Sequence, residues 1–287
     1  MKLGGLHLLV TYQCNRECDH CFVWGGPWQK GAMTIAQVDD ILRQAKETGT
    51  VTGVWFEGGE PMLYYPVVLE GVKRAVALGL TAGIVSNAYW ARTKEDAVLW
   101  LAPFKGLLNS LLISCDPMHW HEDHAMLAAN AGEAVKELGM PLGVLAIPDR
   151  KTGTVPGVMY RGRAAEKLAP RAETRAWEGF TACTPENLRE PVRIHVDYLG
   201  NLHACQGVII GNLFRKPLKD ICAEYDPESH PIIGPLLRGG PAELARRLAI
   251  SPAAEYADAC QLCYETRREL LGRFPEQVGP ASVYGGK

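Results

Sequence analysis

Short apolar runs alternate with amphipathic segments along the first part of the chain. The runs are rich in leucine and in β-branched and aromatic residues, which is typical of buried strands. The five clearest lie at Leu6–Tyr12, Val51–Phe56, Thr81–Val85, Leu107–Ser114 and Leu142–Ile147, with a sixth expected near Val155–Tyr160. Because strands and helices alternate, we expect a parallel sheet whose right-handed crossovers curl it into a full or partial barrel.

Helices are predicted between these strands by apolar residues that recur every three or four positions. Thr34 and Thr93 precede two of them as N-caps, because a threonine hydroxyl accepts a hydrogen bond from the first free N–H groups of a helix. Gly79 and Gly139 follow two others, as glycine commonly does after a helix end. The helices are expected at residues 35–46, 67–78, 95–101 and 122–138.

The pattern changes after residue 160, where a charged segment to about Trp177 predicts a linker helix. Further on, two strand-like segments form a predicted hairpin, and a turn and two short helices follow. These segments lie at Val192–Val196, Leu202–Cys205, Ile209–Leu213, Pro217–Ile221 and Cys263–Leu271. We therefore divide the chain into a barrel over residues 1–160, a linker helix over 161–182 and a small α+β domain over 183–287.

Composition narrows the class of protein. The chain has 287 residues, of which 47% are hydrophobic and 22% charged, as in an ordinary globular protein. A net charge of −2 without a long basic run argues against a nucleic acid partner. No apolar stretch approaches the roughly 20 residues that cross a membrane, and the N-terminus lacks a signal peptide. Nine cysteines without an export signal indicate metal ligands or reactive thiols, so we expect a cytoplasmic protein without disulfides.

Three cysteines stand close together directly after the first predicted strand, at Cys14, Cys18 and Cys21. A structural zinc site is closed by four ligands, and ordinary ferredoxin clusters also use four cysteines, at other spacings. Three cysteines on a four-iron cluster would leave one iron open, and an open metal position is where chemistry takes place. The alternative is that these cysteines pack in the core or bind zinc.

Polar residues follow the other predicted strands, at the end of a barrel where active sites lie. After the second strand comes Gly58-Gly59-Glu60-Pro61, in which two glycines allow close backbone approach to a ligand and a carboxylate follows. The later strands are followed by Ser86-Asn87, by Ser114-Cys115-Asp116 and by Pro148-Asp149. Three histidines and two acids after Asp116 could bind a metal, although such a run more often starts a helix.

The cysteine loop and the Gly-Gly-Glu-Pro segment together resemble the radical SAM enzymes. The resemblance implies a four-iron cluster held by Cys14, Cys18 and Cys21, whose open iron chelates S-adenosylmethionine (SAM). An electron from this cluster then splits SAM into methionine and a 5′-deoxyadenosyl radical. By the same resemblance, the SAM ammonium meets the loop Gly58, Gly59, Glu60 and Pro61, while Asn87 and Ser114 make polar contacts to SAM. His20 takes a position that is usually aromatic and would lie against the adenine, unless it is a solvated loop residue.

A second cysteine set lies near the C-terminus, at Cys183, Cys205, Cys260 and Cys263. Four thiolates suit either a closed zinc site or a 4Fe–4S cluster, and spacing alone does not separate the two. The Gly-x4-Cys element at Gly200–Cys205 and the Gly-Asn-Leu…Leu-Lys-Asp-Ile run resemble the SPASM and shorter Twitch domains of radical SAM enzymes, which bind auxiliary clusters. Four cysteines imply a Twitch-type domain with one auxiliary cluster, and Cys222 is most simply a core residue.

A Gly-Arg-Ala element at residues 162–164 resembles one found at this place in radical SAM enzymes with auxiliary-cluster domains. Arg161 beside it could meet a carboxylate of SAM or substrate; the alternative is a solvated linker arginine. Asp116 is our candidate for the base that takes a proton from substrate, or else a helix N-cap. Cys115 could donate a hydrogen atom, as in an epimerase, or be a buried apolar cysteine.

These observations predict an α/β radical SAM enzyme with a partial TIM-like (β/α)6 barrel and a Twitch-type domain. In the family, a second cluster accepts an electron from a substrate radical, so we expect an oxidoreductase supplied by a flavodoxin- or ferredoxin-type reductant. Small-molecule dehydrogenation is favoured, because the small size and single auxiliary cluster most resemble an aminocyclitol dehydrogenase. The chain begins almost directly on a strand, which leaves no room for an N-terminal peptide-recognition domain and disfavours a leader-peptide substrate unless a separate partner protein supplies recognition. The alternatives are a peptide-modifying maturase and, more distantly, a non-catalytic iron–sulfur or zinc protein.

Overall fold

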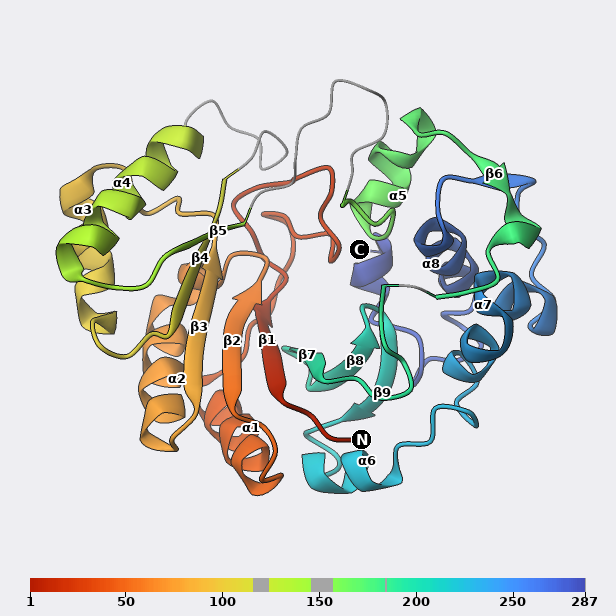
Figure 1. Ribbon diagram of the computed structural model, residues 1–287, viewed down its shortest axis with the longest axis horizontal. Coiled ribbons are helices and arrows are strands. Elements are labelled where there is room, and N and C mark those ends of the chain that lie inside the picture. The colour runs from red at the N-terminus through yellow and green to blue at the C-terminus, as the bar shows by residue number, and fades with distance from the viewer. Residues whose placement is uncertain (116–123, 146–156, 184, 287) are drawn as a thin grey trace.

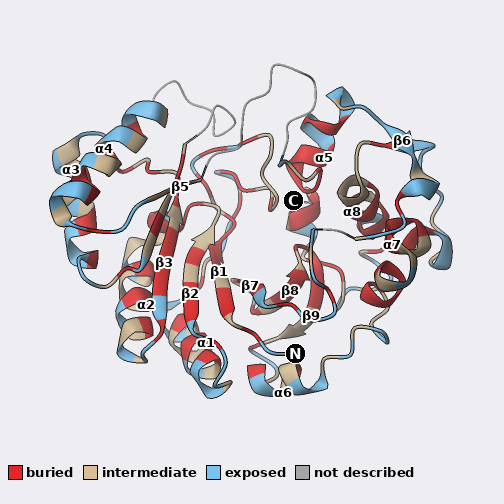
Figure 2. Cartoon of the chain, viewed as in Figure 1, coloured by how far each residue is buried: buried red, intermediate tan, exposed pale blue. Residues whose placement is uncertain are grey.

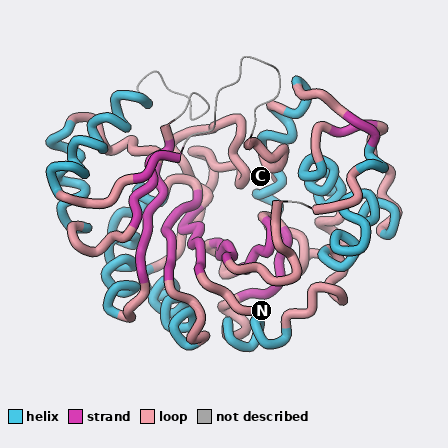
Figure 3. The backbone as a smooth tube through the Cα atoms, in the orientation of Figure 1, coloured by secondary structure: helices cyan, strands magenta, loops and turns pink. Residues whose placement is uncertain are grey.

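One curved sheet contains most of the strands in the residues that the structure, a computed structural model, describes: 1–115, 124–145, 157–183 and 185–286. Its members are β1 (Gly5–Thr11), β2 (Gly53–Gly58), β3 (Thr81–Ser86), β4 (Ser110–Ser114), β5 (Gly143–Leu145), β7 (Arg193–Asp197), β8 (Asn201–Cys205) and β9 (Val208–Asn212). They lie in the order β5-β4-β3-β2-β1-β7-β8-β9, visible as a continuous magenta band in Figure 3. The strands from β5 to β7 in this order are parallel, and β8 and β9 are antiparallel to their neighbours.

Helices cover the outer face of the sheet and fill the C-terminal part (Figure 1). Those that alternate with the first strands are α1 (Ile35–Glu47), α2 (Tyr65–Ala77), α3 (Lys94–Leu101) and α4 (His124–Leu138). The later ones are α5 (Arg163–Lys167), α6 (Leu218–Glu224), α7 (Ile233–Arg247) and α8 (Ala259–Glu269). A separate two-stranded sheet pairs β6 (Arg175–Ala176) with β10 (Glu255–Tyr256). Within the described residues, no helix is both long and apolar enough to cross a membrane.

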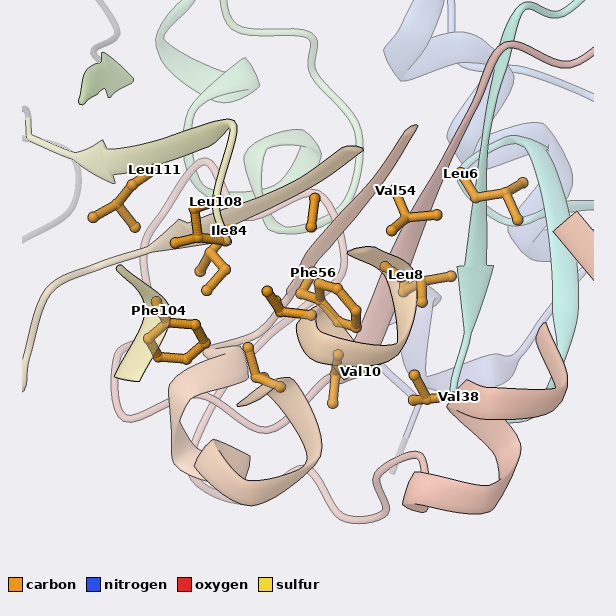
Figure 4. Packing of buried hydrophobic residues seen from close by; sticks show 14 of the residues in the cluster. Leu6, Leu8, Val10, Val38, Val54, Phe56, Ile84, Phe104, Leu108 and Leu111 are labelled. Carbon is orange, nitrogen blue, oxygen red and sulfur yellow. The ribbon is translucent and has the colours of Figure 1, made fainter. Parts of the chain in front are cut away.

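The main core lies between the sheet and its outer helices. Alternate residues of β1 point toward the helices, and Leu6, Leu8 and Val10 are fully buried there. They pack in one cluster with Phe56 of β2 and Val38 of α1 (Figure 4). Figure 2 shows the same division, with buried residues along the strands and exposed ones on the outer sides of the helices. Each buried aliphatic side chain contributes about 1.5–3 kcal/mol, so this layer holds the strand ends in place.

The opposite, inner face of the sheet is built around Trp55. A Cβ placed on Gly83 would lie 2.4 Å from Cδ1 of the Trp55 ring, and one on Gly5 would lie 3.0 Å from Cζ3. Gly53 is also in contact distance, with a Cβ that would lie 3.2 Å from the ring. Glycines on three neighbouring strands therefore make room for one indole, which fills the inner face two residues before Glu57.

Most predicted elements are confirmed. The strands and helices that the apolar pattern predicts up to Leu145 are present, with ends that shift by a few residues. Thr34 caps α1 by accepting from Gln37 N in a capping box, and Thr93 caps α3 by accepting from Asp96 N. The hairpin at β7 and β8 and the short helix α6 are present as well. The α/β class with a parallel sheet is thus confirmed.

Three predictions of local structure are corrected, and one helix was not predicted. Residues 157–160, the described part of the expected sixth strand, form turn and coil. The predicted linker helix ends at Lys167 because Pro170 follows and short 3₁₀ turns replace it. Ile209–Leu213 is mostly strand β9 instead of a turn, paired with β8. The helix α7 was not predicted, since Gly239-Gly240-Pro241 interrupts its pattern with a kink.

The sheet runs across the predicted domain boundary. β7 belongs to the predicted C-terminal domain, yet it pairs in parallel with β1, with His195 opposite His7. β8 and β9 then extend the sheet beyond β7. The division at residues 160 and 182 stays a prediction, but the strands that carry the two cysteine sets share one hydrogen-bonded sheet.

Candidate functional site

The first cysteine loop follows β1 and turns its sulfur atoms toward backbone N–H groups. Arg16 N donates to Cys14 Sγ at 3.4 Å, and Gly25 N donates to Cys21 Sγ at 3.1 Å. Cys14 and Cys18 are buried and Cys21 is half-buried. Burial, and next the Glu60 carboxylate, raise the pKa of the Cys14 thiol. A bound metal would offset this cost, because coordination deprotonates a thiol outright, so the three residues fit a metal cluster.

The glycines after β2 dock this loop by close backbone contact. Gly59 N donates to Thr11 O at 2.7 Å, and Glu60 N donates to Gln13 O at 2.8 Å. A Cβ on Gly58, where φ is +138°, would lie 2.3 Å from Thr11 O, and one on Gly59 would lie 2.1 Å from Gln13 O. Any other residue would clash with the chain that leads into Cys14.

Glu60 is completely buried and joins the ends of β2 and β3. Its carboxylate accepts from Met62 N at 3.0 Å, from Ser86 Oγ at 2.9 Å and from Asn87 N at 2.7 Å. Burial raises the pKa of Glu60 to about 7, against the lowering effect of these hydrogen bonds. The contacts of the carboxylate are thus with protein groups, and they place Asn87 beside the cysteine loop.

Asn87 connects this arrangement to the cysteines. Its side-chain amide donates to Asn15 Oδ1 at 2.8 Å and lies 3.7 Å from Cys14 Sγ. Pro61 begins a 3₁₀ turn directly after Glu60. The structure therefore brings together the cysteine loop, Gly58–Pro61 and Asn87, as the sequence predicts.

The remaining candidates of the barrel are placed only in part. Ser114 is buried at the end of β4, and Cys115 follows it, half-buried. His20 is half-buried within the cysteine loop. Asp116, with the acids and most of the histidines after it, lies outside the described residues, as do Pro148 and Asp149. The roles expected for Ser114, Cys115, Asp116 and His20 stay predictions.

The second cysteine set lines a single small cavity. Cys205 ends β8, whereas Cys260 and Cys263 lie in the first turns of α8, where Asp258 caps the helix by accepting from Gln261 N. Cys183 lies opposite, on a segment packed closely against α7: a Cβ on Gly240 would lie 2.3 Å from Ala182 N. All four cysteines of the predicted set thus face one space. Cys222 packs against the main core, as expected.

Two buried arginines adjoin this cavity. Arg161 Nη1 donates to Cys205 Sγ at 3.1 Å and to Glu186 Oε1 at 3.2 Å. Arg267 Nε donates to Cys263 O at 3.2 Å, and its Nη1 donates to Gln206 O at 2.7 Å. The contacts of Arg161 are therefore with the second cysteine set; its expected contact to SAM stays a prediction. Positive charge beside four thiols fits an anionic cluster, because buried charges need partners.

Sulfur spacing bears on the choice between zinc and iron. Among the described residues, no three cysteine sulfurs of either set all lie within 4.8 Å of one another. A single zinc ion with four tetrahedral bonds of about 2.3 Å would bring its sulfur ligands to about 3.8 Å. A four-iron cluster is larger than one ion, so its ligands stand farther apart. The spacing of each donor set fits a cluster.

The sequence analysis missed Arg163, which holds the first loop in place. Its Nη1 donates to Cys18 O at 2.8 Å, its Nη2 to Gly25 O at 2.6 Å, and its backbone N to Cys21 O at 2.8 Å. Gly162, at φ +61°, makes this approach possible, since a Cβ there would lie 2.4 Å from Cys21 O. The Gly-Arg-Ala element that drew attention to Arg161 was the signal, and the adjacent arginine carries these contacts.

Further contacts join the two cysteine sites. Arg161, at the second site, lies over the ring of Phe22 at 5.9 Å, directly after Cys21. Trp24 Nε1 donates to Tyr264 Oη on α8 at 2.8 Å. Tyr12 Oη lies 3.4 Å from Asp197 Oδ2, which also pairs with His203 at 3.1 Å. The two sites are thus fixed relative to each other by buried polar and aromatic contacts.

Comparison with known proteins identifies the barrel. Residues 8–119 match the family described as the Radical SAM superfamily. This segment contains the three loop cysteines, the Gly58–Pro61 segment and Asn87. Residues 8–119 of the chain belong to the radical SAM superfamily. The family implies a 4Fe–4S cluster and SAM as cofactors.

The relatives of this chain are distant. YydG of Bacillus subtilis (strain 168), named as a peptide biosynthesis protein, is 24% identical over 108 residues, which are 37% of this chain and 34% of YydG. The match therefore spans about a third of that relative. The structure of native anSMEcpe with bound AdoMet has a TM-score of 0.51 and 12% identity, covering 94% of this chain and 97% of that one. The likeness confirms the fold over nearly the whole chain.

Two other solved structures are less similar. BtrN in complex with AdoMet and 2-DOIA is 16% identical with a TM-score of 0.48, covering 77% of this chain and 82% of that one. Streptococcus suis SuiB bound to precursor peptide SuiA is 12% identical with a TM-score of 0.42, covering 91% of this chain and 76% of that one. Neither likeness carries an argument about substrate.

Proposed function

We propose that this radical SAM enzyme is an oxidoreductase that takes a hydrogen atom from its substrate and passes an electron to an auxiliary 4Fe–4S cluster. The observation that carries the proposal is the single cavity lined by Cys183, Cys205, Cys260 and Cys263, where the lining residue Arg161 lies over the ring of Phe22 beside the first cysteine loop. When bound, the first cluster and SAM supply hydrogen-atom abstraction, and the second cluster supplies an electron acceptor.

Hydrogen bonds and backbone packing within the protein fix the conformation of the first cysteine loop. Arg16 N and Gly25 N donate to the sulfurs of Cys14 and Cys21, and such hydrogen bonds tune the reduction potential of a bound cluster. The Gly58–Gly59 backbone packs on the chain before Cys14, which fixes the loop against two strand ends. Arg163 closes the loop from the other side through three carbonyl contacts.

The second site suits electron acceptance. Four cysteines would leave no open ligand position on a four-iron cluster, so SAM would have no place there. Arg161 and Arg267 are buried beside the cysteines, and nearby positive charge favours the more negative, reduced form of a cluster. Phe22 directly follows Cys21 and lies 5.9 Å from the guanidinium of Arg161, so a ring contact links the two sites.

For the substrate, we propose a small polar molecule that is dehydrogenated. The inner face of the barrel carries His7, Glu57 and His195 above Trp55, and this surface suits a compact polar ligand. The second candidate is a peptide, because the distant relative YydG is named as a peptide biosynthesis protein. A proton acceptor for the oxidation is proposed at Asp116, which lies outside the described residues.

Iron content and SAM cleavage test the proposal. After anaerobic reconstitution we expect about eight irons per chain. Changing Cys260 and Cys263 to Ala should leave about four irons and retain reductive formation of 5′-deoxyadenosine from SAM. Changing Cys14, Cys18 and Cys21 to Ala should also leave about four, with no 5′-deoxyadenosine. Cys222→Ala is the matched control and should keep all eight.

Two results would contradict the proposal. About four irons together with zinc in the wild type would make the second site structural, and electron transfer to it would then be wrong. Failure of the wild type to form 5′-deoxyadenosine under reduction would favour the non-catalytic alternative instead.

A further inference from the structure

A third group of metal-ligand residues lies on the inner face of the sheet, outside both cysteine sites. His7 is on β1, Glu57 on β2 and His195 on β7, and β1 pairs with both neighbours. His7 and His195 are direct partners, and Glu57 lies opposite Leu9, one step further along. Strands that are far apart in the sequence thus bring two imidazoles and a carboxylate to one spot.

The ligand atoms of these three side chains converge. They all lie within 4.8 Å of one another. His7 Nδ1 is 2.5 Å from Glu57 Oε1, and His195 Nε2 is 3.5 Å from the same oxygen. Among the described residues, this is the one group of three or more histidine, cysteine or acidic side chains with such close atoms.

Neighbouring rings hold both imidazoles in fixed orientations. His7 stacks on Trp55, with centroids 5.0 Å apart and an angle of 15° between the planes. His195 lies against Phe22 at 5.8 Å. The side chains of the three residues are 13–17% exposed, so the group is sheltered but open on one side.

The charges around the group are mixed. Arg161 acts electrostatically on His195, and Arg193 on Glu57. Arg161 is already paired with Glu186, and Arg193 is exposed, where solvent screens its charge. These cations weaken the attraction for a further positive charge but leave the Glu57 carboxylate facing the two histidines.

We propose that His7, Glu57 and His195 form a binding site for one divalent cation of the zinc type. Two imidazoles and one carboxylate are ligands that such ions accept, at about 2.0–2.2 Å. The ion would replace the hydrogen bond between His7 and Glu57. Three protein ligands leave a coordination position open for water or a donor atom of a ligand, as in catalytic zinc sites. The site uses no cysteine and goes beyond the function proposed above.

Zinc itself is the probe for the test. The enzyme with both clusters reconstituted is freed of loose metal with a chelator and dialysed anaerobically against Zn²⁺. We expect about one zinc per chain, with X-ray absorption at the zinc edge showing nitrogen and oxygen neighbours near 2.0–2.2 Å and no sulfur near 2.3 Å. The two edges of iron and zinc are separate, so the clusters do not interfere.

Three variants identify the ligands. Glu57→Gln and His195→Gln should each bind zinc at least about 100-fold more weakly, since loss of an outer-shell partner alone costs 10–100-fold. His230→Gln is the matched control. The His230 ring lies away from the proposed site, with Nε2 bonded to Ile209 O and Nδ1 accepting from Ile232 N, so this variant should bind zinc like the wild type. Iron content and melting temperature report folding, and His7→Gln replaces a variant that fails to fold.

The proposal is overturned by any of three results. Absence of zinc beyond background in the wild type would leave the group a hydrogen-bonded cluster only. Sulfur neighbours at the zinc edge would place the ion at cysteines. Equal zinc affinity in the wild type and in folded Glu57→Gln and His195→Gln would remove these residues as ligands.

Discussion

At the residue scale, the first cysteine loop depends on contacts that tolerate no extra atom. Gly58 and Gly59 pack directly on the carbonyl groups of Thr11 and Gln13, and Glu60 collects three hydrogen bonds in a fully buried position. An unpaired buried polar group costs about 1–3 kcal/mol. The loop geometry therefore follows from a few atoms, and single substitutions should show it.

Gly59→Ala should selectively damage the first site. The added Cβ would lie 2.1 Å from Gln13 O, and the backbone must move at a cost of about 1–3 kcal/mol. We expect iron per reconstituted chain to fall from about eight toward about four, with 5′-deoxyadenosine formation lost. Gly272→Ala, where a Cβ meets nothing within 4 Å, is the control. Full iron loading and activity in Gly59→Ala would show that the loop can move aside.

Glu60 should titrate close to neutral pH. Its pKa is raised by burial to about 7, from 4.5 in the unfolded chain. The folded state therefore keeps a proton that the unfolded state loses, so the contribution to stability is complete below pH 4.5 and declines as pH rises to about 7. Difference infrared spectra should show a protonated carboxyl band that fades with a midpoint near 7 and is absent in Glu60→Gln. If the same band persists in Glu60→Gln, it belongs to another carboxyl group and the prediction for Glu60 is wrong.

At the element scale, the inner and outer faces of the strands require different types of residue. The outer face needs apolar side chains at alternate positions, whereas the inner face combines glycines, one indole and a polar group. Trp55 supports His7 by stacking. The inner face is thus built as a unit, and a change on one strand should be felt on its neighbours.

Gly83→Ala on β3 should destabilise the inner face. Its Cβ would lie 2.4 Å from the Trp55 ring, which must tilt away from His7 at a cost of about 1–3 kcal/mol. The melting temperature should fall by several degrees, because 1 kcal/mol corresponds to roughly 2–4 °C in a large domain. Gly132→Ala in α4 is the control, because its Cβ would meet Leu142 Cδ2 at 3.7 Å, an ordinary contact distance. It should be neutral or stabilising by up to about 1 kcal/mol, and equal melting of the two variants would contradict the packing argument.

Local signals account for most of the elements that the sequence predicts correctly. Thr34 and Thr93 act on N–H groups three residues away, so their role is visible without knowledge of the fold. The helix α7 was missed because Gly240 interrupts its helical pattern. This glycine is needed for close packing against Ala182, which is distant in the sequence. β9 was missed because its strand character depends on pairing with β8.

The residues of the candidate sites also fall into two groups, those that the sequence reveals and those that only the fold brings together. Cys14 and its neighbours and Gly58–Pro61 are contiguous motifs, and the structure brings them together as predicted. His7, Glu57 and His195 were not recognised, because only the pairing of β1 with β2 and β7 makes them neighbours. Arg161 and Arg163 differ by two positions, and only the fold shows that one contacts the second cysteine set and the other the first loop.

At the scale of the whole molecule, the two cysteine sites form one connected region. Arg163 reaches the first loop from the segment that follows the barrel, and Trp24 of that loop reaches α8. The second site and the first loop therefore support each other across the predicted domain boundary. Damage to this connection should appear at the first cluster even though the changed residue is far from it in sequence.

Arg163→Lys should weaken the first site. A lysine has a single ammonium group and cannot bridge Cys18 O and Gly25 O as the guanidinium does, which leaves a buried carbonyl unpaired at a cost of about 1–3 kcal/mol. We expect faster loss of iron from the first site under a chelator, with the second site retained. Arg171→Lys, at an exposed position, should lose iron at the wild-type rate. Identical rates in both variants would mean that Arg163 does not secure the loop.

The pairing of β1 with β7 also has a consequence for biosynthesis. His7 and its partner His195 are 188 residues apart, from 195 minus 7. At roughly 5–20 residues per second, a ribosome needs about 10–40 s to make the second strand after the first. During that time one edge of the nascent sheet stays unpaired, and open edges recruit other chains. Productive assembly should therefore depend on protection of that edge by chaperones until β7 has been made.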